Sequence, residues 1–235
     1  MANIKSYRNN IGEWLQLFWT NLVVKKRNFM EYLKVVAWYY PNIAFMKIDL
    51  AVLSKYLFKS PFAISKEFMI KKGEKDIYVY GETPLTTLDY IADQCDFSSA
   101  DTVFELGCGR GRGCFWLHCI LNCKVVGIEY IPEFVKCANK VKEKFDVKGV
   151  EFRLEDILKT DYTGATVLYL YGTCFETPFI NKLIERFSHL PSGTKIITVS
   201  YSLNDYTDRP LFEVMKRFTA RFTWGETDVY LHIKK

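Results

Sequence analysis

Residues 102–113 read Thr-Val-Phe-Glu-Leu-Gly-Cys-Gly-Arg-Gly-Arg-Gly. A short apolar run ends in an acid, breaks into alternating glycines and continues into residues 114–121, whose apolar character is typical of a buried helix. An open α/β sheet builds a nucleotide-type pocket from such a strand, glycine loop and helix. Glycine lets the backbone approach a ligand and adopt a positive φ. The stretch therefore predicts a ligand-binding turn in an α/β sheet.

The spacing of the glycines selects among nucleotide-type ligands. The dinucleotide pattern G-x-G-x-x-G fails from Gly107, because its last position falls on Arg112, and it fails from the next two glycines as well. The phosphate loop G-x-x-x-x-G-K-[ST] fails because no Gly-Lys-Ser/Thr follows. What remains is E-x-G-x-G-x-G. Its carboxylate, Glu105, suits a cofactor with a cationic end; a glycine turn without a ligand is the alternative.

This stretch resembles motif I of the class I S-adenosylmethionine-dependent methyltransferases. The resemblance implies an α/β fold: a Rossmann-like seven-stranded sheet with helices on both faces. It also implies S-adenosyl-L-methionine as the cofactor. The residues expected to contact that cofactor in this loop are Glu105, Gly107, Gly109 and Gly111.

Two further acids follow the expected second and third strands. Glu129 ends the run 124–129, 22 positions beyond Gly107. An acid about 20 residues beyond the glycines accepts hydrogen bonds from ribose hydroxyls. After the expected strand 150–154, the resemblance implies that Asp156 accepts from the adenine amino group and that Ile157 packs on the ring. A simple loop cap is the alternative for Asp156.

The remaining pattern alternates strands and helices to the C-terminus. Thr83 and Pro84 predict a helix start, with Thr83 as the N-cap and Pro84 at the first helical position. Continuous apolar runs predict strands over 166–171 and 194–199, with a helix opened by Pro178 between them. The tail predicts a helix over 211–216 and a hairpin of two strands, 219–224 and 228–233.

Residues 1–75 form a distinct N-terminal part, expected to be a helical, basic and aromatic-rich extension of a methyltransferase domain spanning 76–235. They carry 13 Lys/Arg and 5 Asp/Glu, so their balance is +8 within a chain of net charge +5. Three helices are predicted, over 14–23, 29–40 and 48–57, with Lys25-Lys26-Arg27 ending the first. The extension is expected to cap the catalytic domain or to contact a membrane surface peripherally. No apolar run approaches the roughly 20 residues needed to span a bilayer.

A closer resemblance starts at Tyr80-Gly81-Glu82-Thr83. It is similar to the loop before motif I in the disruptor-of-telomeric-silencing family, the non-SET histone-lysine methyltransferases. The resemblance implies that Tyr80 and Thr83 contact the cofactor and that Glu82 assists the acceptor or fixes the loop. Trp224 followed by Tyr230-Leu231-His232 resembles that family's Trp…Tyr-Leu-His strand, which lines the target-lysine channel. The chain departs from the family after the fourth strand, where Tyr171-Gly172-Thr173 replaces Asn-Asn-Phe.

This closer resemblance implies a protein-lysine methyltransferase. A lysine acceptor has a free pKa of about 10.4 and must lose a proton, which an apolar channel favours by desolvation. The candidate catalytic residues are Glu82, Tyr171, Trp224 and Tyr230, with Phe175 as a further channel aromatic, and sheet core is the alternative for the aromatics. A small-molecule acceptor, an RNA acceptor and a non-catalytic cofactor-binding scaffold stay open. An RNA acceptor has less support, because no Asn/Asp-Pro-Pro-aromatic motif follows the fourth strand.

The cysteines indicate a reducing compartment, and the histidines do not indicate a metal site. Seven cysteines show no C-x-x-C pair and no disulfide-scaffold spacing, which is typical of reduced thiols. The three histidines lie far apart in sequence, so no metal site is expected. The N-terminus lacks a cleavage site after a compact apolar core, so no signal peptide is expected. The expected location is the cytoplasm.

Overall fold

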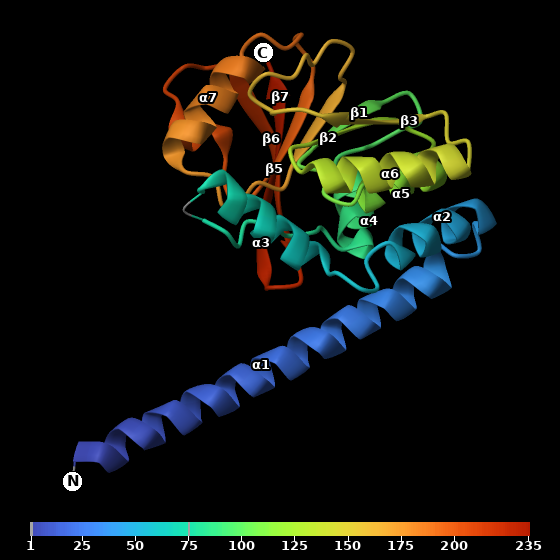
Figure 1. Ribbon diagram of the computed structural model, residues 1–235. Coiled ribbons are helices and arrows are strands. Elements are labelled where there is room, and N and C mark those ends of the chain that lie inside the picture. Colours follow the sequence, from blue (N-terminus) through green and yellow to red (C-terminus); the bar gives the residue numbers. More distant parts are fainter. Residues whose placement is uncertain (1, 75) are drawn as a thin grey trace.

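The computed structural model describes residues 2–74 and 76–235, and within the first helix it describes the side chains of residues 18–20 and 22–38. The expected apolar stripe at Trp14, Leu15 and Leu17 therefore lies outside the described side chains. The body of the molecule is one sheet covered by helices, and a long helix projects from it (Figure 1).

The sheet has seven strands in the order β3-β2-β1-β4-β5-β7-β6. Neighbours among β3, β2, β1, β4 and β5 pair in parallel, and β7 lies antiparallel between β5 and β6. This mixed seven-stranded sheet confirms the predicted fold class. The strands are β1 (Thr102–Leu106), β2 (Lys124–Glu129), β3 (Val150–Leu154), β4 (Val167–Leu170), β5 (Lys195–Val199), β6 (Phe212–Arg221) and β7 (Glu226–Lys234).

Helices cover both faces of the sheet, as expected from the alternation of apolar side chains along the strands. In β1, Val103 belongs to one buried cluster and Phe104 to the other, because successive strand residues point to opposite faces. The first cluster includes apolar residues of α4 (Leu85–Gln94), α5 (Arg112–Leu121) and α6 (Pro132–Lys144). The second packs under α7 (Thr177–Phe187) and the short 3₁₀-helix η1 (Leu203–Tyr206).

The N-terminal part forms three helices whose bounds differ from the prediction. The first two expected helices are one, α1 (Ala2–Trp38), because Lys25-Lys26-Arg27 are good helix formers and do not interrupt it. The third begins earlier, as α2 (Ile43–Ser54), where the side chain of Asn42 accepts from the Phe45 amide. A further helix, α3 (Pro61–Lys72), was not predicted, although Ser60-Pro61 is a helix-start signal.

Two other local predictions are wrong. The predicted helix 211–216 is the first half of β6, because pairing with β7 along its length overrides local propensity. Helix α4 begins one residue later than predicted, with Pro84 at the N-cap position and no side-chain cap of its own. The hydroxyl of Thr83 is instead within hydrogen-bonding distance of Tyr169.

No helix in the described part of the chain is long and apolar enough to cross a membrane. Buried side chains of α2, among them Phe45, Ile48 and Val52, belong to the same apolar cluster as α5 and α6. The second helix of the N-terminal part is thus packed into the body of the molecule.

Candidate cofactor and acceptor site

A cleft opens at the carboxyl end of β1, where the glycine loop turns into α5. The amides of Gly107 and Cys108 donate to the Ile128 carbonyl at 2.8 and 3.0 Å, so the loop is fixed to the end of β2. Gly107 has φ +79° and no atom within 4 Å of a Cβ built there. Gly107 therefore presents bare backbone to open space. The cleft is lined by Gly81, Glu82, Thr83, Glu105, Gly107, Cys108, Arg112, Gly113 and Tyr171.

Glu105 places a carboxylate in this cleft without a cation. The Cys114 thiol donates to its Oε2 at 3.0 Å, and Glu105 forms no ion pair with any described residue. Burial raises the pKa of Glu105 to about 7, an effect that the Cys114 hydrogen bond only partly offsets. A positively charged group entering the cleft would relieve this penalty.

Glu129 ends β2 as a buried carboxylate held by backbone amides. Its Oε2 accepts from Gly109 at 2.8 Å, and its Oε1 accepts from Tyr130 and Ile131 at 2.7 and 2.8 Å. Burial raises the pKa of Glu129, and the three amides act against that rise. Since a carboxylate offers about four lone-pair sites, three amides leave Oε2 with capacity for a further donor.

The segment after β3 holds the predicted adenine-side residues. Asp156 accepts from the Leu158 amide at 2.9 Å, so it caps the local turn, and Ile157 is half-buried against the cluster under α7. The neighbouring Glu155 was missed by sequence reasoning. Its Oε2 is buried without a hydrogen-bond partner, and its amide donates to the Glu129 carbonyl at 3.1 Å. Its position directly after the third strand was the available signal.

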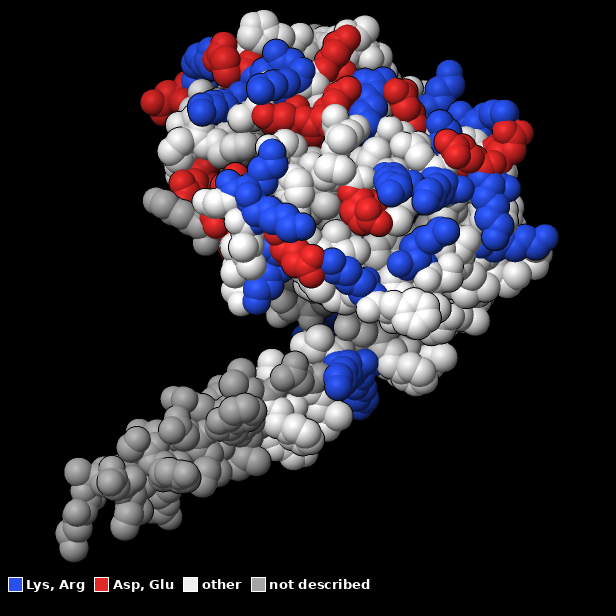
Figure 2. Space-filling model, viewed as in Figure 1, with Lys and Arg blue, Asp and Glu red and all other residues white. Residues whose placement is uncertain are grey.

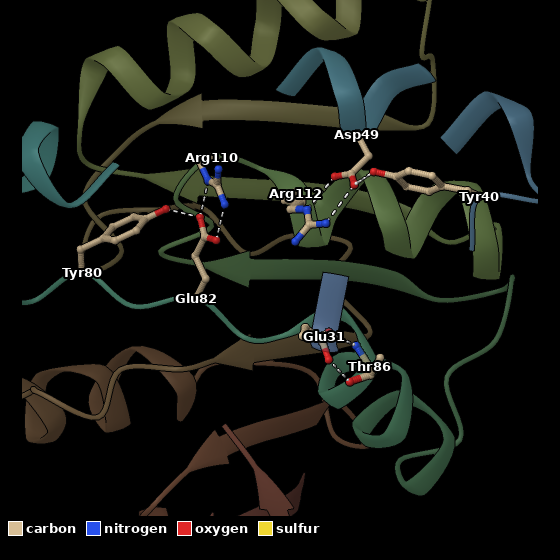
Figure 3. Close-up of polar contacts among 8 residues, drawn as sticks. All are labelled: Glu31, Tyr40, Asp49, Tyr80, Glu82, Thr86, Arg110 and Arg112. Atoms are coloured by element: carbon tan, nitrogen blue, oxygen red, sulfur yellow. Dashed lines mark hydrogen bonds and ion pairs between the residues drawn. The ribbon is translucent and has the colours of Figure 1, made fainter. Parts of the chain in front are cut away.

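The loop before α4 is joined to the glycine loop by an ion pair. Arg110 donates from Nε and Nη2 to the two carboxylate oxygens of Glu82, each at 2.5 Å, and the Tyr80 hydroxyl also donates to Glu82 (Figure 3). Burial acts to raise the pKa of Glu82, but Arg110 outweighs it and the pKa is lowered. The Arg110 guanidinium lies 5.2 Å from the centroid of the Tyr56 ring. Glu82 is therefore held ionised between the two loops.

A second arginine of the glycine loop is bound by the N-terminal part. Arg112 donates from Nε and Nη2 to Asp49 of α2 at 2.6 and 2.9 Å, and the Tyr40 hydroxyl donates to Asp49 at 2.9 Å (Figure 3). Asp49 is 1% exposed. Sequence reasoning missed this pair and the Arg110–Glu82 pair, and a lone acid in the apolar run 43–54 was the only local signal.

Tyr171 is the aromatic residue that lines the cleft, and two further rings pack beside it. Tyr171 lies beside Gly81, and its hydroxyl accepts from the Trp224 indole at 2.6 Å. The Phe222 ring stacks on both, with centroid distances of 5.3 Å to Tyr171 and 5.8 Å to Trp224. Trp224 is half exposed, so the stack runs from the cleft towards solvent.

The structure does not bring Tyr230 and Phe175 into this stack. Along β7 the neighbours of Tyr230 face the cluster that contains Phe222, so Tyr230 faces the other side of the sheet. Its ring stacks on His232 at 6.1 Å. The Phe175 ring lies 4.4 Å from that of Phe179.

Among residues 2–74 and 76–235, no group of three or more His, Cys, Asp or Glu side chains is arranged to hold a metal ion. The arrangement at the cleft fits S-adenosyl-L-methionine instead. The Glu105 carboxylate, which has no cation beside it among the described residues, lies in the cleft with the bare backbone of Gly107. The Glu129 carboxylate lies at the end of the neighbouring strand β2. These features suit a cationic end and a ribose, respectively.

Comparison with known proteins agrees with this geometry. Residues 97–216 match a family model described as "Methyltransferase domain". The chain is 25% identical over 136 residues to "Histone-lysine N-methyltransferase, H3 lysine-79 specific" of Dictyostelium discoideum, covering 52% of this chain and 7% of that protein. It is 28% identical over 133 residues to "Phosphoethanolamine N-methyltransferase 3" of Arabidopsis thaliana, covering 55% of this chain and 26% of that protein.

The chain thus spans much less than two thirds of the length of either curated relative. Among solved structures, it is similar to an RNA methyltransferase from Salinibacter ruber in complex with S-adenosyl-L-homocysteine. The identity is 28%, the TM-score is 0.53, and the alignment covers 66% of this chain and 94% of that one.

Proposed function

The chain belongs to the methyltransferase domain family and depends on S-adenosyl-L-methionine, and from this premise we propose that its methyl acceptor is the ε-amino group of a protein lysine. We take residues 76–235 as the catalytic domain and residues 1–75 as its extension. The proposal rests on the residues of the cleft, because the fold alone is compatible with many acceptors.

The cofactor would be held by the residues at the ends of β1, β2 and β3. In this proposal Glu105 faces the ammonium end, Glu129 accepts from the ribose, and Gly107, Gly109 and Gly111 let the backbone approach. Asp156, Ile157 and the unpartnered Glu155 are the candidates for the adenine side. Tyr80 and Thr83 would close the loop over the cofactor; their hydroxyls are presently bonded to Glu82 and Tyr169.

The observation that carries the lysine proposal is the Tyr171–Phe222–Trp224 stack at the cleft. When bound, the cofactor supplies an electrophilic methyl group on a sulfonium. A lysine must arrive without its proton, although its free pKa is about 10.4. The Tyr171 ring, which lines the cleft, would remove water from the ammonium form and so lower that pKa. In this proposal Tyr171 orients the amine, and the hydrogen bond from the Trp224 indole fixes the Tyr171 hydroxyl.

Glu82 acts in this proposal as a positioning residue. Its carboxylate accepts from Arg110 and Tyr80 and its pKa is lowered, so it is a poor acceptor for a proton from the substrate. It fixes the loop 80–83 against the glycine loop. Tyr230 has no part in the proposal, because its ring lies with His232.

The names of the curated relatives favour an amine acceptor. Both are N-methyltransferases, one of histone lysine and one of phosphoethanolamine. A small-molecule amine is therefore the second candidate, and the RNA methyltransferase with a similar structure keeps an RNA acceptor as the third.

One labelling experiment separates these candidates. The purified protein is incubated with cell lysate and S-adenosyl-L-methionine labelled in the methyl group. Label in protein bands that resist ribonuclease, and in methyl-lysine after hydrolysis, is the expected result. Label found only in RNA or in small metabolites would refute the lysine proposal. Binding of the cofactor, measured by calorimetry, without any transfer would identify a scaffold.

A further inference from the structure

Helix α1 carries an apolar surface that nothing in the described part of the chain covers. Its contacts with the body run through one side, where Glu31 accepts from the amide and hydroxyl of Thr86 at 3.0 and 2.6 Å and Val35 is buried. The opposite side is exposed. Phe18, Trp19 and Phe29 are 62%, 60% and 60% exposed. The other exposed large apolar residues of α1 are Leu22, Val23, Met30, Tyr32, Leu33, Val36 and Trp38.

Five of these residues lie along one side of the helix and are called the apolar stripe. Phe18, Leu22, Phe29, Leu33 and Val36 follow one another at intervals of three, four or seven residues, which places them along one side of a helix. Glu31 and Val35 lie on the other side, towards α4. Exposed apolar surfaces of this extent mark binding sites on proteins.

The charges of α1 indicate what binds there. Lys25, Lys26, Arg27 and Lys34 are exposed, and none forms an ion pair with another described residue. The single acidic residue between residues 18 and 38, Glu31, accepts a hydrogen bond from the Thr86 amide. On the face shown in Figure 2, the described part of α1 accordingly shows basic and uncharged atoms and no acidic ones.

We propose that α1 docks on an anionic lipid surface, lying in the plane of the membrane with its apolar stripe inserted between headgroups. Aromatic and aliphatic residues beside Lys and Arg are the composition of helices that bind membranes in this way. Lys25 and Lys26 flank the apolar stripe, where their long stems can bury while the ammonium groups reach the phosphates. A second copy of the chain is a poorer occupant, because in the described part of α1 basic residues would face basic residues with no exposed acid between residues 18 and 38.

The test is sedimentation of the full chain with vesicles of phosphatidylcholine, with and without phosphatidylserine. The expected result is binding that requires phosphatidylserine and weakens in high salt. The variant F29E/L33E should no longer bind the vesicles, because it places two acids in the apolar stripe. The variant K25E/K26E/R27E should bind roughly tenfold less or worse, because each basic residue near an anionic surface contributes.

Matched variants control for added charge. M215E places an acid at another exposed apolar residue, 58% exposed on β6, and K124E/K136E/K182E reverses three exposed charges elsewhere. Both should bind as the unaltered protein does, and circular dichroism and calorimetry of cofactor binding check that all variants fold. Absence of vesicle binding would overturn the proposal, as would equal binding by F29E/L33E. Loss of self-association or of RNA binding in the same variants, without vesicle binding, would assign the surface to a second copy or to RNA.

Discussion

Asp49 of α2 and Arg112 at the start of α5 form a two-point ion pair, with Nε–Oδ1 at 2.6 Å and Nη2–Oδ2 at 2.9 Å, on the wall of the cofactor cleft. The pair joins the N-terminal part to the glycine loop. Removing one partner leaves the other charge buried, so we expect Asp49→Ala to lower the free energy of unfolding by about 3 kcal/mol. We also expect it to weaken S-adenosyl-L-methionine binding.

Urea unfolding and calorimetry measure the two effects of Asp49→Ala. The matched control is Glu67→Ala, whose pair with Lys59 is half exposed on both sides and should contribute less than about 1 kcal/mol. Equal losses in the two variants would contradict the structural importance assigned to Asp49.

Glu105 predicts a pH dependence of stability. Its pKa is raised to about 7 by burial, so the folded protein binds this proton more tightly than the unfolded chain does. Stability from Glu105 is therefore fully present below pH 4.5 and is lost as the pH rises to about 7. The loss amounts to about 3 kcal/mol over that window. Glu105→Gln should remove it, which denaturant unfolding at a series of pH values measures.

Other groups also have a raised pKa, so the decisive measurement compares the pH dependence of stability in the wild type with that in Glu105→Gln. Glu129 also has a raised pKa, and the Glu105→Gln variant retains Glu129. A cationic cofactor end near Glu105 should also release its proton, which calorimetry below pH 7 in buffers of different ionisation enthalpy detects. Identical pH profiles for the wild type and Glu105→Gln would contradict the burial of a titrating Glu105.

Sequence reasoning located the elements whose signals are local. The spacing of glycines placed the turn between β1 and α5, and the distance from Gly107 placed Glu129 at the end of β2. These signals suffice because a strand, a turn and a helix are specified by consecutive residues.

What sequence reasoning missed depends on contacts between distant segments. Asp49 and Arg112 are 63 positions apart, and no periodicity links them. The run 211–216 has a helix-like pattern but pairs with β7, so tertiary pairing decided its conformation. Tyr230 is near Trp224 in sequence, yet strand alternation turned it to the other face of the sheet.

Adding a single methyl group at Gly111 should lower the free energy of unfolding strongly. Its φ is +73°, and an added Cβ would lie 2.4 Å from the Phe152 ring, so strain and overlap both act against Gly111→Ala. We expect a loss of about 3 kcal/mol in thermal or urea unfolding. Gly164 is the matched control, since its φ is +85° with no atom within 4 Å of an added Cβ. Gly164→Ala should cost about 1 kcal/mol from conformation alone, and a similar cost at both sites would show that Phe152 does not press on the loop.

The Tyr171–Trp224 hydrogen bond predicts a variant that binds cofactor but transfers poorly. Tyr171→Phe keeps the ring and removes the acceptor of the indole N–H. We expect methyl transfer to fall roughly fivefold, because the lost hydrogen bond is worth about 1 kcal/mol and its loss frees the Trp224 ring to move. Cofactor affinity by calorimetry should stay within error. Tyr90→Phe, on an exposed ring away from the cleft, is the control, and equal rates for both variants would exclude Trp224 positioning by Tyr171.

Glu31 predicts how α1 is held on the body. Helix α4 has Pro84 at its N-cap and no side-chain cap of its own, and Glu31 supplies acceptors for the amide and the hydroxyl of Thr86 in the first turn. A carboxylate is also favoured at a helix N-terminus by the dipole. A double-mutant cycle with Glu31→Ala and Thr86→Val should therefore give a coupling free energy of about 1 kcal/mol in urea unfolding.

The cycle has an internal comparison on the surface. Glu185 and Arg209 form an exposed pair, 60% and 54% exposed, whose coupling should be below about 0.5 kcal/mol. A larger coupling at Glu31–Thr86 than at Glu185–Arg209 means that α1 is fixed to α4 on its polar side, which turns the stripe of Phe18, Leu22 and Phe29 away from the body. Additive effects of Glu31→Ala and Thr86→Val would mean that this contact does not fix α1 to α4. The contact would then not explain why the apolar stripe points away from the body.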